Sequence, residues 1–184
     1  MKKLCVLLIC MVMGCSSLDI HEGDAYPFRA EIQGRAHIKG RELIVTGGLC
    51  IESDGMGIVQ VYGPAGIGAY TMQISLDRLI ISDMWGRLVE DYEIPVNIIS
   101  TLAGVPPRGA YLLKRRVGED IKVTYTWGYI VLDGNLLPEE IHMRTDPAMD
   151  IFFRKQGRTI RLMIEHGSDK YDLKVLIQEG GRWL

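Results

Sequence analysis

Alternating hydrophobic and polar residues predict β-strands over most of the chain from about Tyr26 onward. The clearest alternating runs are residues 30–38, 42–52, 70–77, 121–127, 159–162 and 171–175. Alternation of this kind is typical of strands that bury one face and leave the other in water. Turn-forming residues separate the runs, at Ser53-Asp54-Gly55, Asp83 to Gly86, Asp133-Gly134-Asn135, Gln156-Gly157 and His166 to Asp169. We therefore expect about ten or eleven antiparallel strands joined by short turns.

One segment, residues 95–104, interrupts this pattern. It begins with Pro95 and ends with Gly104, as short helices commonly do. Its apolar residues Ile98, Ile99 and Leu102 share one helical face, and Val105-Pro106-Pro107 stops the helix. One short helix is too small to cover a whole sheet, so the sheet has to curve around it. We predict a mainly β fold for residues 26–184, a single domain in which a curved antiparallel sheet forms an incomplete barrel with a small helical lid.

The N-terminal residues have the features of a secretory signal. Lys2 and Lys3 precede an apolar run over residues 4–13, which is too short to span a bilayer as a helix. The run ends in Val12-Met13-Gly14-Cys15, which resembles the lipobox of bacterial lipoproteins. The resemblance implies that residues 1–14 are cleaved and that Cys15 is lipidated, with residues 15–25 as lipidated N-terminus and linker. A plain signal peptide or a single-pass anchor with a chance cysteine is the alternative.

The residue after the lipobox cysteine concerns the location of the protein. It is Ser16, whereas an aspartate there favours retention in the inner membrane of enteric bacteria. By resemblance, we expect a lipid-anchored protein of the bacterial outer membrane that faces the periplasm. Two or more acyl chains would hold it stably, at about 0.8 kcal/mol per buried methylene.

Charge and cysteine content narrow the range of functions. The whole chain has a formal net charge of −2, and loss of Lys2 and Lys3 with the signal makes it −4. An acidic chain without a basic cluster argues against nucleic acid as a partner. Cleavage and lipidation leave Cys50 alone, so no intramolecular disulfide is expected.

The residue types give little support for catalysis. The histidines at 21, 37, 142 and 166 show no metal-binding spacing, and no nucleophile motif is present. The glycine-rich residues 63–68 lack the lysine and the following helix of a phosphate-binding loop. We expect these residues to join two antiparallel strands. We predict no enzymatic activity, no cofactor and no metal site.

The apolar residues of the strands form either a core or the wall of a cavity, because both use the same side chains. Phe152 and Phe153 are neighbours, so only one of them can point inward from a strand. The candidate lining residues for an acyl-chain cavity and its lid are Met72, Ile74, Ile98, Ile99, Leu102, Tyr125, Trp127, Tyr129 and Phe152.

The order of features resembles a known family. The lipobox is followed by Gly34-Arg35, by a strand ending in Tyr62-Gly63-Pro64-Ala65-Gly66, and by an alternating strand closing in Leu76-Asp77. The helix with its Pro-Pro and a series of C-terminal strands come next. Over about residues 26–178 this order is similar to the outer-membrane lipoprotein receptors of the LolB family and the related LolA-like lipoprotein carriers. The resemblance implies an incomplete barrel with a helical lid over an apolar cavity.

The resemblance also implies a function: to accept the acyl chains of lipoproteins from a periplasmic LolA-like carrier and insert them into the outer membrane. In the LolB family an exposed leucine in the loop at this position assists insertion. Here Pro64, Ala65 and Ile67 occupy the loop, and Ile67 is its large apolar side chain. The alternatives are an envelope scaffold of the same fold with a filled core and an enzyme with a site assembled from distant residues. An interior void would favour the carrier, and an interior packed by the protein's own aromatic residues would favour the scaffold.

Overall fold

The computed structural model describes residues 25–38, 40–53, 56–62, 68–75, 78–93, 99–107 and 111–183. It contains one short helix, α2 (Ile99–Leu102), among these residues. The strands are β1 (Phe28–Ile38), β2 (Arg41–Ser53), β3 (Met56–Tyr62), β4 (Gly68–Ser75), β5 (Arg78–Asp83), β6 (Leu88–Glu93), β7 (Leu113–Val117), β8 (Asp120–Thr124), β9 (Gly128–Leu132), β10 (Pro138–Met143), β11 (Met149–Gln156), β12 (Thr159–His166) and β13 (Asp169–Glu179).

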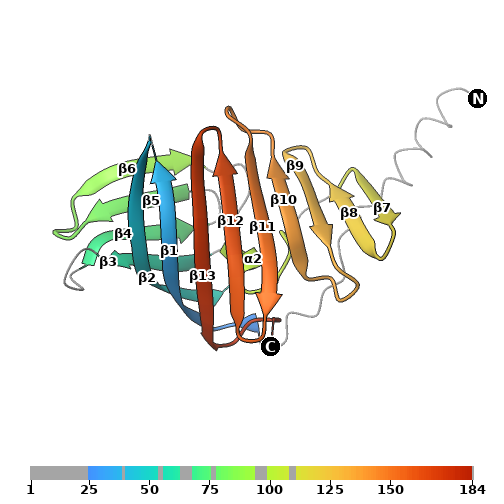
Figure 1. Cartoon of the computed structure of the whole chain (residues 1–184), viewed down its shortest axis with the longest axis horizontal. Coiled ribbons are helices and arrows are strands. Elements are labelled where there is room, and N and C mark those ends of the chain that lie inside the picture. Colours follow the sequence, from blue (N-terminus) through green and yellow to red (C-terminus); the bar gives the residue numbers. More distant parts are fainter. Residues whose placement is uncertain are drawn as a thin grey trace, which may run out of the picture.

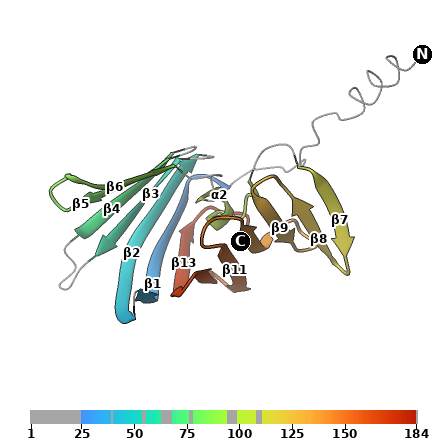
Figure 2. The ribbon, with the colours of Figure 1, turned by 90° about the horizontal axis from the view of Figure 1, so that it is seen from above.

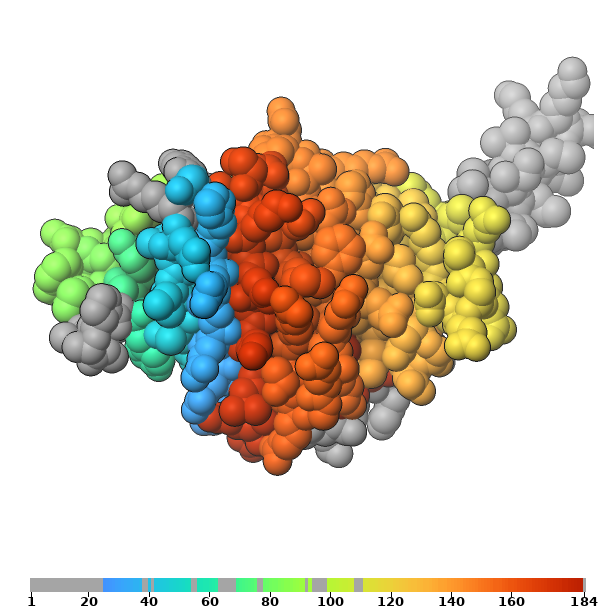
Figure 3. All heavy atoms as spheres, viewed as in Figure 1, coloured from blue at the N-terminus to red at the C-terminus, as the bar shows by residue number. Residues whose placement is uncertain are grey.

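All thirteen strands belong to one sheet, in the order β6-β5-β4-β3-β2-β1-β13-β12-β11-β10-β9-β8-β7. The strand order therefore begins with β1 in the middle of the sheet, proceeds outward to β6, continues with β7 at the other edge, and returns to β13 in the middle. There β13 pairs antiparallel with β1, with Gly34 opposite Leu173. Figure 3 shows this pairing on the surface, where β1 (blue) lies against β13 (red).

The sheet is curved and open. Figure 2 shows β1, β13 and β11 at the bottom of a trough, with β3–β6 rising as one wing and β7–β9 as the other. Helix α2 lies inside the curve, and in Figure 1 it is seen behind the strands. Within the described residues, β6 pairs only with β5 and β7 only with β8, so the sheet does not close into a barrel. The predicted fold class, a mainly β structure built on an incomplete antiparallel barrel with a small helix, is confirmed.

The two faces of the sheet differ in polarity. The face toward α2, here called the concave face, contains the apolar core. The opposite, convex face contains cross-strand ion pairs such as Arg161–Asp172, whose shortest N–O separation is 2.6 Å. The alternating sequence produces this division, because directly paired residues point to the same side of a sheet. The largest fully buried side chains include Phe28, Ile51, Ile130, Leu132, Ile141 and Ile160.

Two glycines allow neighbouring strands to approach closely. A Cβ atom on Gly128 would lie 1.9 Å from the carbonyl oxygen of His142, and one on Gly34 would lie 2.1 Å from that of Asp172. These distances are far below van der Waals contact, so a side chain at either position would force the backbones apart. The glycines are thus requirements of the strand packing.

The predicted positions of the turns match the structure more closely than the predicted number of strands and the predicted length of the helix. Turns fall at Gly86, Gly134, Gly157 and Gly167, as expected. The sheet has thirteen strands, more than the expected ten or eleven. The helix covers four residues of the predicted ten, and residues 94–98 lie outside the described part of the chain. No helix among the described residues is long and apolar enough to cross a membrane.

Candidate functional site

A group of aliphatic side chains lies on the concave face of the wing formed by β3, β4 and β5. Strand pairing places Val59, Met72 and Ile81 in one row across the wing. Ile74 and Leu79 form the row beside it, and Val61 lies beyond Val59 on the same face. We call these six residues the concave patch: Val59, Val61, Met72, Ile74, Leu79 and Ile81. All six side chains are half-buried, so the patch is apolar but still accessible.

The concave patch measures about 10 Å across the strands and about 14 Å along them, from standard strand spacings. Val59 and Ile74 pack against the central core, whereas Met72, Leu79 and Ile81 lie outside it. The patch therefore extends the hydrophobic interior outward along the wing. A surface of this kind can hold apolar ligands by burial of area, at roughly 25 cal/mol per Å².

Helix α2 lies at the inner boundary of the patch and contacts β2 and β3. Ile99 is 3% exposed, and a Cβ atom placed on Gly57 of β3 would lie 3.1 Å from its Cγ1. The C-terminal segment also contacts the helix, because the Trp183 indole donates a hydrogen bond to the Leu102 carbonyl at 2.8 Å. The backbone N–H of Arg182 donates to the Ala103 carbonyl at 2.8 Å. Of the predicted lid residues, Ile99 is thus in the core, Leu102 packs against it half-buried, and Ile98 lies outside the described residues.

Aromatic residues pack the middle of the concave face. Tyr125 stacks on Trp127 with ring centroids 4.8 Å apart, and Phe153 stacks on Trp183 at 6.0 Å. Tyr125 is 2% exposed and its hydroxyl donates to the Pro107 carbonyl at 3.2 Å. Burial, with a smaller contribution from nearby Tyr111, raises the pKa of Tyr125 to about 12. The described residues thus fill the centre of the trough, and accessible apolar surface lies on the wing.

Two predicted lining residues, Tyr129 and Phe152, lie on the convex face. Phe152 pairs with Met163, while Ile151 and Phe153 point into the core. Tyr129 pairs with His142 and alternates with the buried residues Gly128 and Ile130. Tyr129 and Phe152 are therefore separated from Tyr125 and Trp127, which lie between β8 and β9 and contact the core.

Tyr129 belongs to a polar network on the convex face. Its hydroxyl donates to Glu140 at 2.7 Å, and its ring stacks on His142 with centroids 5.0 Å apart. The Nδ1 atom of His142 lies 2.6 Å from Asp150, and the Lys122 ammonium lies 3.3 Å from the Tyr129 ring centroid. The hydrogen bond to Glu140 is the main reason that the pKa of Tyr129 is raised to about 12. Each of these polar groups has a partner inside the network. The network therefore stabilises the pairing of neighbouring strands.

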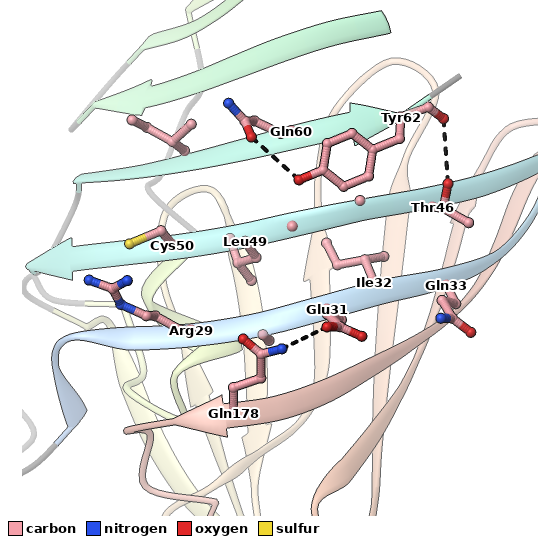
Figure 4. Close-up of a pocket in the computed structure, with 14 residues that line it drawn as sticks. Arg29, Glu31, Ile32, Gln33, Thr46, Leu49, Cys50, Gln60, Tyr62 and Gln178 are labelled. Carbon is pink, nitrogen blue, oxygen red and sulfur yellow. Dashed lines mark hydrogen bonds between the residues drawn. The ribbon is translucent and has the colours of Figure 1, made fainter. Parts of the chain in front are cut away.

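A shallow hollow of about 550 Å³ also lies on the convex face, over β1, β2 and β3 (Figure 4). Gly48 of β2 lines it, and a Cβ atom placed there would lie 3.3 Å from the Tyr62 hydroxyl oxygen. Tyr62 donates to Gln60 at 3.4 Å, and Gln178 donates to Glu31 at 2.7 Å. Amide, hydroxyl and charged groups line much of this hollow, whereas the concave patch is formed by apolar side chains alone.

The described residues contain no cluster of three or more potential metal ligands. Cys15 and the loop residues Pro64, Ala65 and Ile67 lie outside the described part of the chain. The flanking strands are informative: β3 and β4 pair antiparallel, with Tyr62 opposite Gly68, so residues 63–67 do join two antiparallel strands as expected.

Sequence reasoning named two members of the concave patch, Met72 and Ile74, and missed Val59, Val61, Leu79 and Ile81. The sequence Arg78-Leu79-Ile80-Ile81 is continuously apolar over three residues, which hides the period-two signal. It also missed the exposed residues Met84 and Trp85, which lie within a segment identified only as a turn.

Comparison with known proteins supports the fold assignment. The structure is similar to the crystal structure of a LolA superfamily protein from Nitrosomonas europaea, with a TM-score of 0.50 and 9% sequence identity. The match covers 80% of this chain and 83% of that one. No protein-family model and no curated protein sequence matches the chain. The chain therefore has a LolA-like fold, established by its three-dimensional structure.

Proposed function

We propose that this protein is a non-enzymatic, LolB-like lipoprotein that binds acyl chains on its concave patch. In this proposal Cys15 carries the lipid anchor and holds the domain at the periplasmic side of the outer membrane. The protein accepts the acyl chains of lipoproteins from a LolA-like carrier and delivers them to the membrane. Pro64, Ala65 and Ile67 form the predicted insertion loop. No covalent chemistry and no cofactor are required, since transfer follows differences in affinity.

The observation that carries the proposal is the concave patch within a LolA-like fold. Six aliphatic side chains lie side by side on the inner face of an open sheet, and each remains partly accessible. A folded domain normally buries such side chains fully or replaces them with polar ones at the surface. Met72 suits this role, because an unbranched thioether adapts to chains of irregular shape.

The packed centre of the trough favours a second candidate function. The aromatic pairs Tyr125–Trp127 and Phe153–Trp183 fill the interior beneath α2. A filled interior fits an envelope scaffold of the same fold that holds no ligand. The two candidates differ in whether apolar ligands occupy the wing.

Acyl binding is tested directly by extraction of lipids from the purified full chain and mass spectrometry of the extract. Fluorescent fatty-acid binding then gives an affinity. Met72→Glu places a carboxylate against the bound chain and should weaken binding by about tenfold or more, since an unpaired charge is poorly tolerated beside apolar groups.

Gln73→Glu is the matched control. Gln73 is the next residue on β4, is exposed, and points to the convex face, so the same new charge should leave acyl binding unchanged. Equal effects of the two variants would show that the concave face is not the binding surface. Absence of both co-purified acyl chains and fatty-acid binding would favour the scaffold.

A further inference from the structure

The turn between β5 and β6 carries an unusual amount of exposed apolar surface. Trp85 is 70% exposed, Leu88 is 64% exposed and Met84 is 52% exposed. We call residues 84–88 the hairpin tip. It lies at the outer end of the β3–β6 wing (Figure 1), away from α2 and from the central core. Exposed apolar groups of this size that cluster at one projecting turn mark an interaction surface.

The backbone of the hairpin tip is held by internal hydrogen bonds. Asp83 N–H donates to the Arg87 carbonyl and Gly86 N–H donates to the Asp83 carbonyl, both at 2.9 Å. The Asp83 carboxylate accepts from the N–H groups of Trp85 and Arg87, again at 2.9 Å. Four backbone N–H groups, those of Asp83, Trp85, Gly86 and Arg87, therefore need no water. Such a turn can enter a region of low water content at a small desolvation cost.

The charges of the tip are also compensated within it. The guanidinium of Arg87 binds the Asp83 carboxylate at 2.7 Å and lies over the Trp85 ring, 4.7 Å from its centroid. Desolvation opposes ionisation of Asp83, but the hydrogen bonds from Arg87 and Trp85 prevail and lower its pKa. The tip thus presents an indole, a thioether and an isobutyl group around a neutralised ion pair.

This combination matches the boundary between lipid headgroups and acyl chains. Tryptophan concentrates there because its ring is apolar and its N–H can reach water, and arginine extends to the headgroups. We propose that the hairpin tip contacts the interfacial region of a lipid bilayer through Trp85, Met84 and Leu88. The proposal assigns membrane contact to the β5–β6 hairpin in addition to the predicted loop at residues 63–67, and it does not require acyl binding by the concave patch.

Neighbouring residues support this arrangement. Tyr70 lies opposite Asp83 on β4 and is 45% exposed, so it adds a second aromatic side chain at the same end of the wing. The flanks Tyr62 and Gly68 of the β3–β4 loop lie at this end too, because successive hairpins of a meander alternate between the two ends.

The charge near the tip predicts the kind of lipid it prefers. Beyond the tip, β6 carries Glu90, Asp91 and Glu93, with Asp91 paired to Arg78. Acidic side chains beside the tip oppose attraction to an anionic surface. Contact should therefore arise from apolar insertion, be stronger on zwitterionic than on anionic vesicles, and change little with salt.

Trp85 emission provides the test. The full chain is mixed with phosphatidylcholine vesicles whose acyl chains carry bromine, a short-range quencher of tryptophan. The difference between the wild type and Trp85→Phe isolates Trp85 from Trp127 and Trp183, which are half-buried and buried. We expect Trp85 emission to shift to shorter wavelength and to be quenched, with no change in the emission remaining in Trp85→Phe.

Charged substitutions complete the test. Met84→Glu and Leu88→Glu should each lower the quenched fraction of Trp85 emission by about fivefold or more, since each replaces inserted apolar area by a charge. Leu113→Glu is the control, since Leu113 is 57% exposed but lies on β7 at the opposite edge of the sheet.

Two results would overturn the inference. One is Trp85 emission that is insensitive to brominated lipid, and the other is Trp85 emission that changes only when another protein is added. The readout is independent of acyl binding. Fatty-acid binding should persist in the tip variants, and loss of fatty-acid binding in Met72→Glu should leave the Trp85 quench intact.

Discussion

The docking of α2 on the sheet gives the sharpest quantitative prediction. Ile99→Ala removes three carbon atoms from a side chain that is 3% exposed. At about 0.8 kcal/mol per methylene, the lost transfer energy is about 2.4 kcal/mol, and the cavity left behind adds to it. The better helix propensity of alanine returns roughly 0.4 kcal/mol. We expect the free energy of unfolding to fall by about 2–4 kcal/mol.

Urea unfolding of the full chain measures this loss. For a protein of this size it corresponds to a decrease in Tm of about 5–15 °C. Leu102→Ala is the matched control on the same helix, because Leu102 is only partly buried and its backbone carbonyl, which Trp183 binds, remains in place. Its loss should be about half as large or less.

A double-mutant cycle with Gly57 tests the geometry itself. A Cβ atom on Gly57 would lie 3.1 Å from Ile99 Cγ1, so Gly57→Ala alone crowds the helix and should destabilise the fold by about 1 kcal/mol. In the Ile99→Ala background the new methyl group occupies space that the isoleucine has vacated. The double variant should therefore be more stable than the sum of the single effects predicts, by about 0.5 kcal/mol or more.

Two results would refute this picture of the helix. One is a loss below about 1 kcal/mol for Ile99→Ala, which would mean that α2 is not firmly seated. The other is strict additivity in the cycle, which would mean that Ile99 does not pack on Gly57.

Three further predictions concern the sheet, the buried tyrosine and the anchor. Gly128→Ala should destabilise the fold by about 3 kcal/mol or prevent folding, because its Cβ would meet the His142 carbonyl oxygen. Gly134→Ala is the control and should be nearly neutral, because the space around Gly134 is open. Urea unfolding compares the stability of the two variants. Because the pKa of Tyr125 is raised to about 12, its contribution to stability is complete below about pH 10 and is lost as pH rises toward 12. Unfolding measured across this range should therefore show a smaller alkaline loss for Tyr125→Phe, and an unchanged slope would contradict the assignment. The wild type should incorporate labelled palmitate in cells and Cys15→Ala should not; label retained by the variant would exclude lipidation at Cys15.

The middle and the wing of the trough differ in how completely their side chains are packed. The middle is closed by contacts far apart in sequence, with Trp183 against Phe153 and against the carbonyl of Leu102. The β3–β6 wing receives little of this packing, and the strands β5 and β6 have no fully buried side chain among their described residues. Apolar residues on the wing are therefore available to ligands or to a membrane, whereas the same residue types in the middle stabilise the fold.

Local sequence by itself determined most of the strands, most of the turns and the mainly β class of the fold. Period-two alternation, as in residues 121–125, reports that one face is buried, and glycine with its neighbours marks where the chain reverses. The short helix was also predictable from the sequence, because a glycine, Gly104, follows it. In the structure Gly104 has the positive φ of 79° that is common just after a helix ends. These signals depend on interactions within a few residues, so they can be read without the rest of the chain.

Tertiary structure decided which residues meet and which face each one uses. The pairing of β1 with β13 joins residues from the two ends of the chain, and no local pattern encodes it. Alternation shows that Phe152 and Phe153 point to opposite sides, but only the register against β12 places Phe153 in the core and Phe152 on the convex face. Trp85 is a further case, because the local sequence of a turn does not show whether its apolar side chain packs inward or projects into solvent. Its exposure follows from the position of the β5–β6 hairpin at the end of the wing, which is a property of the assembled sheet.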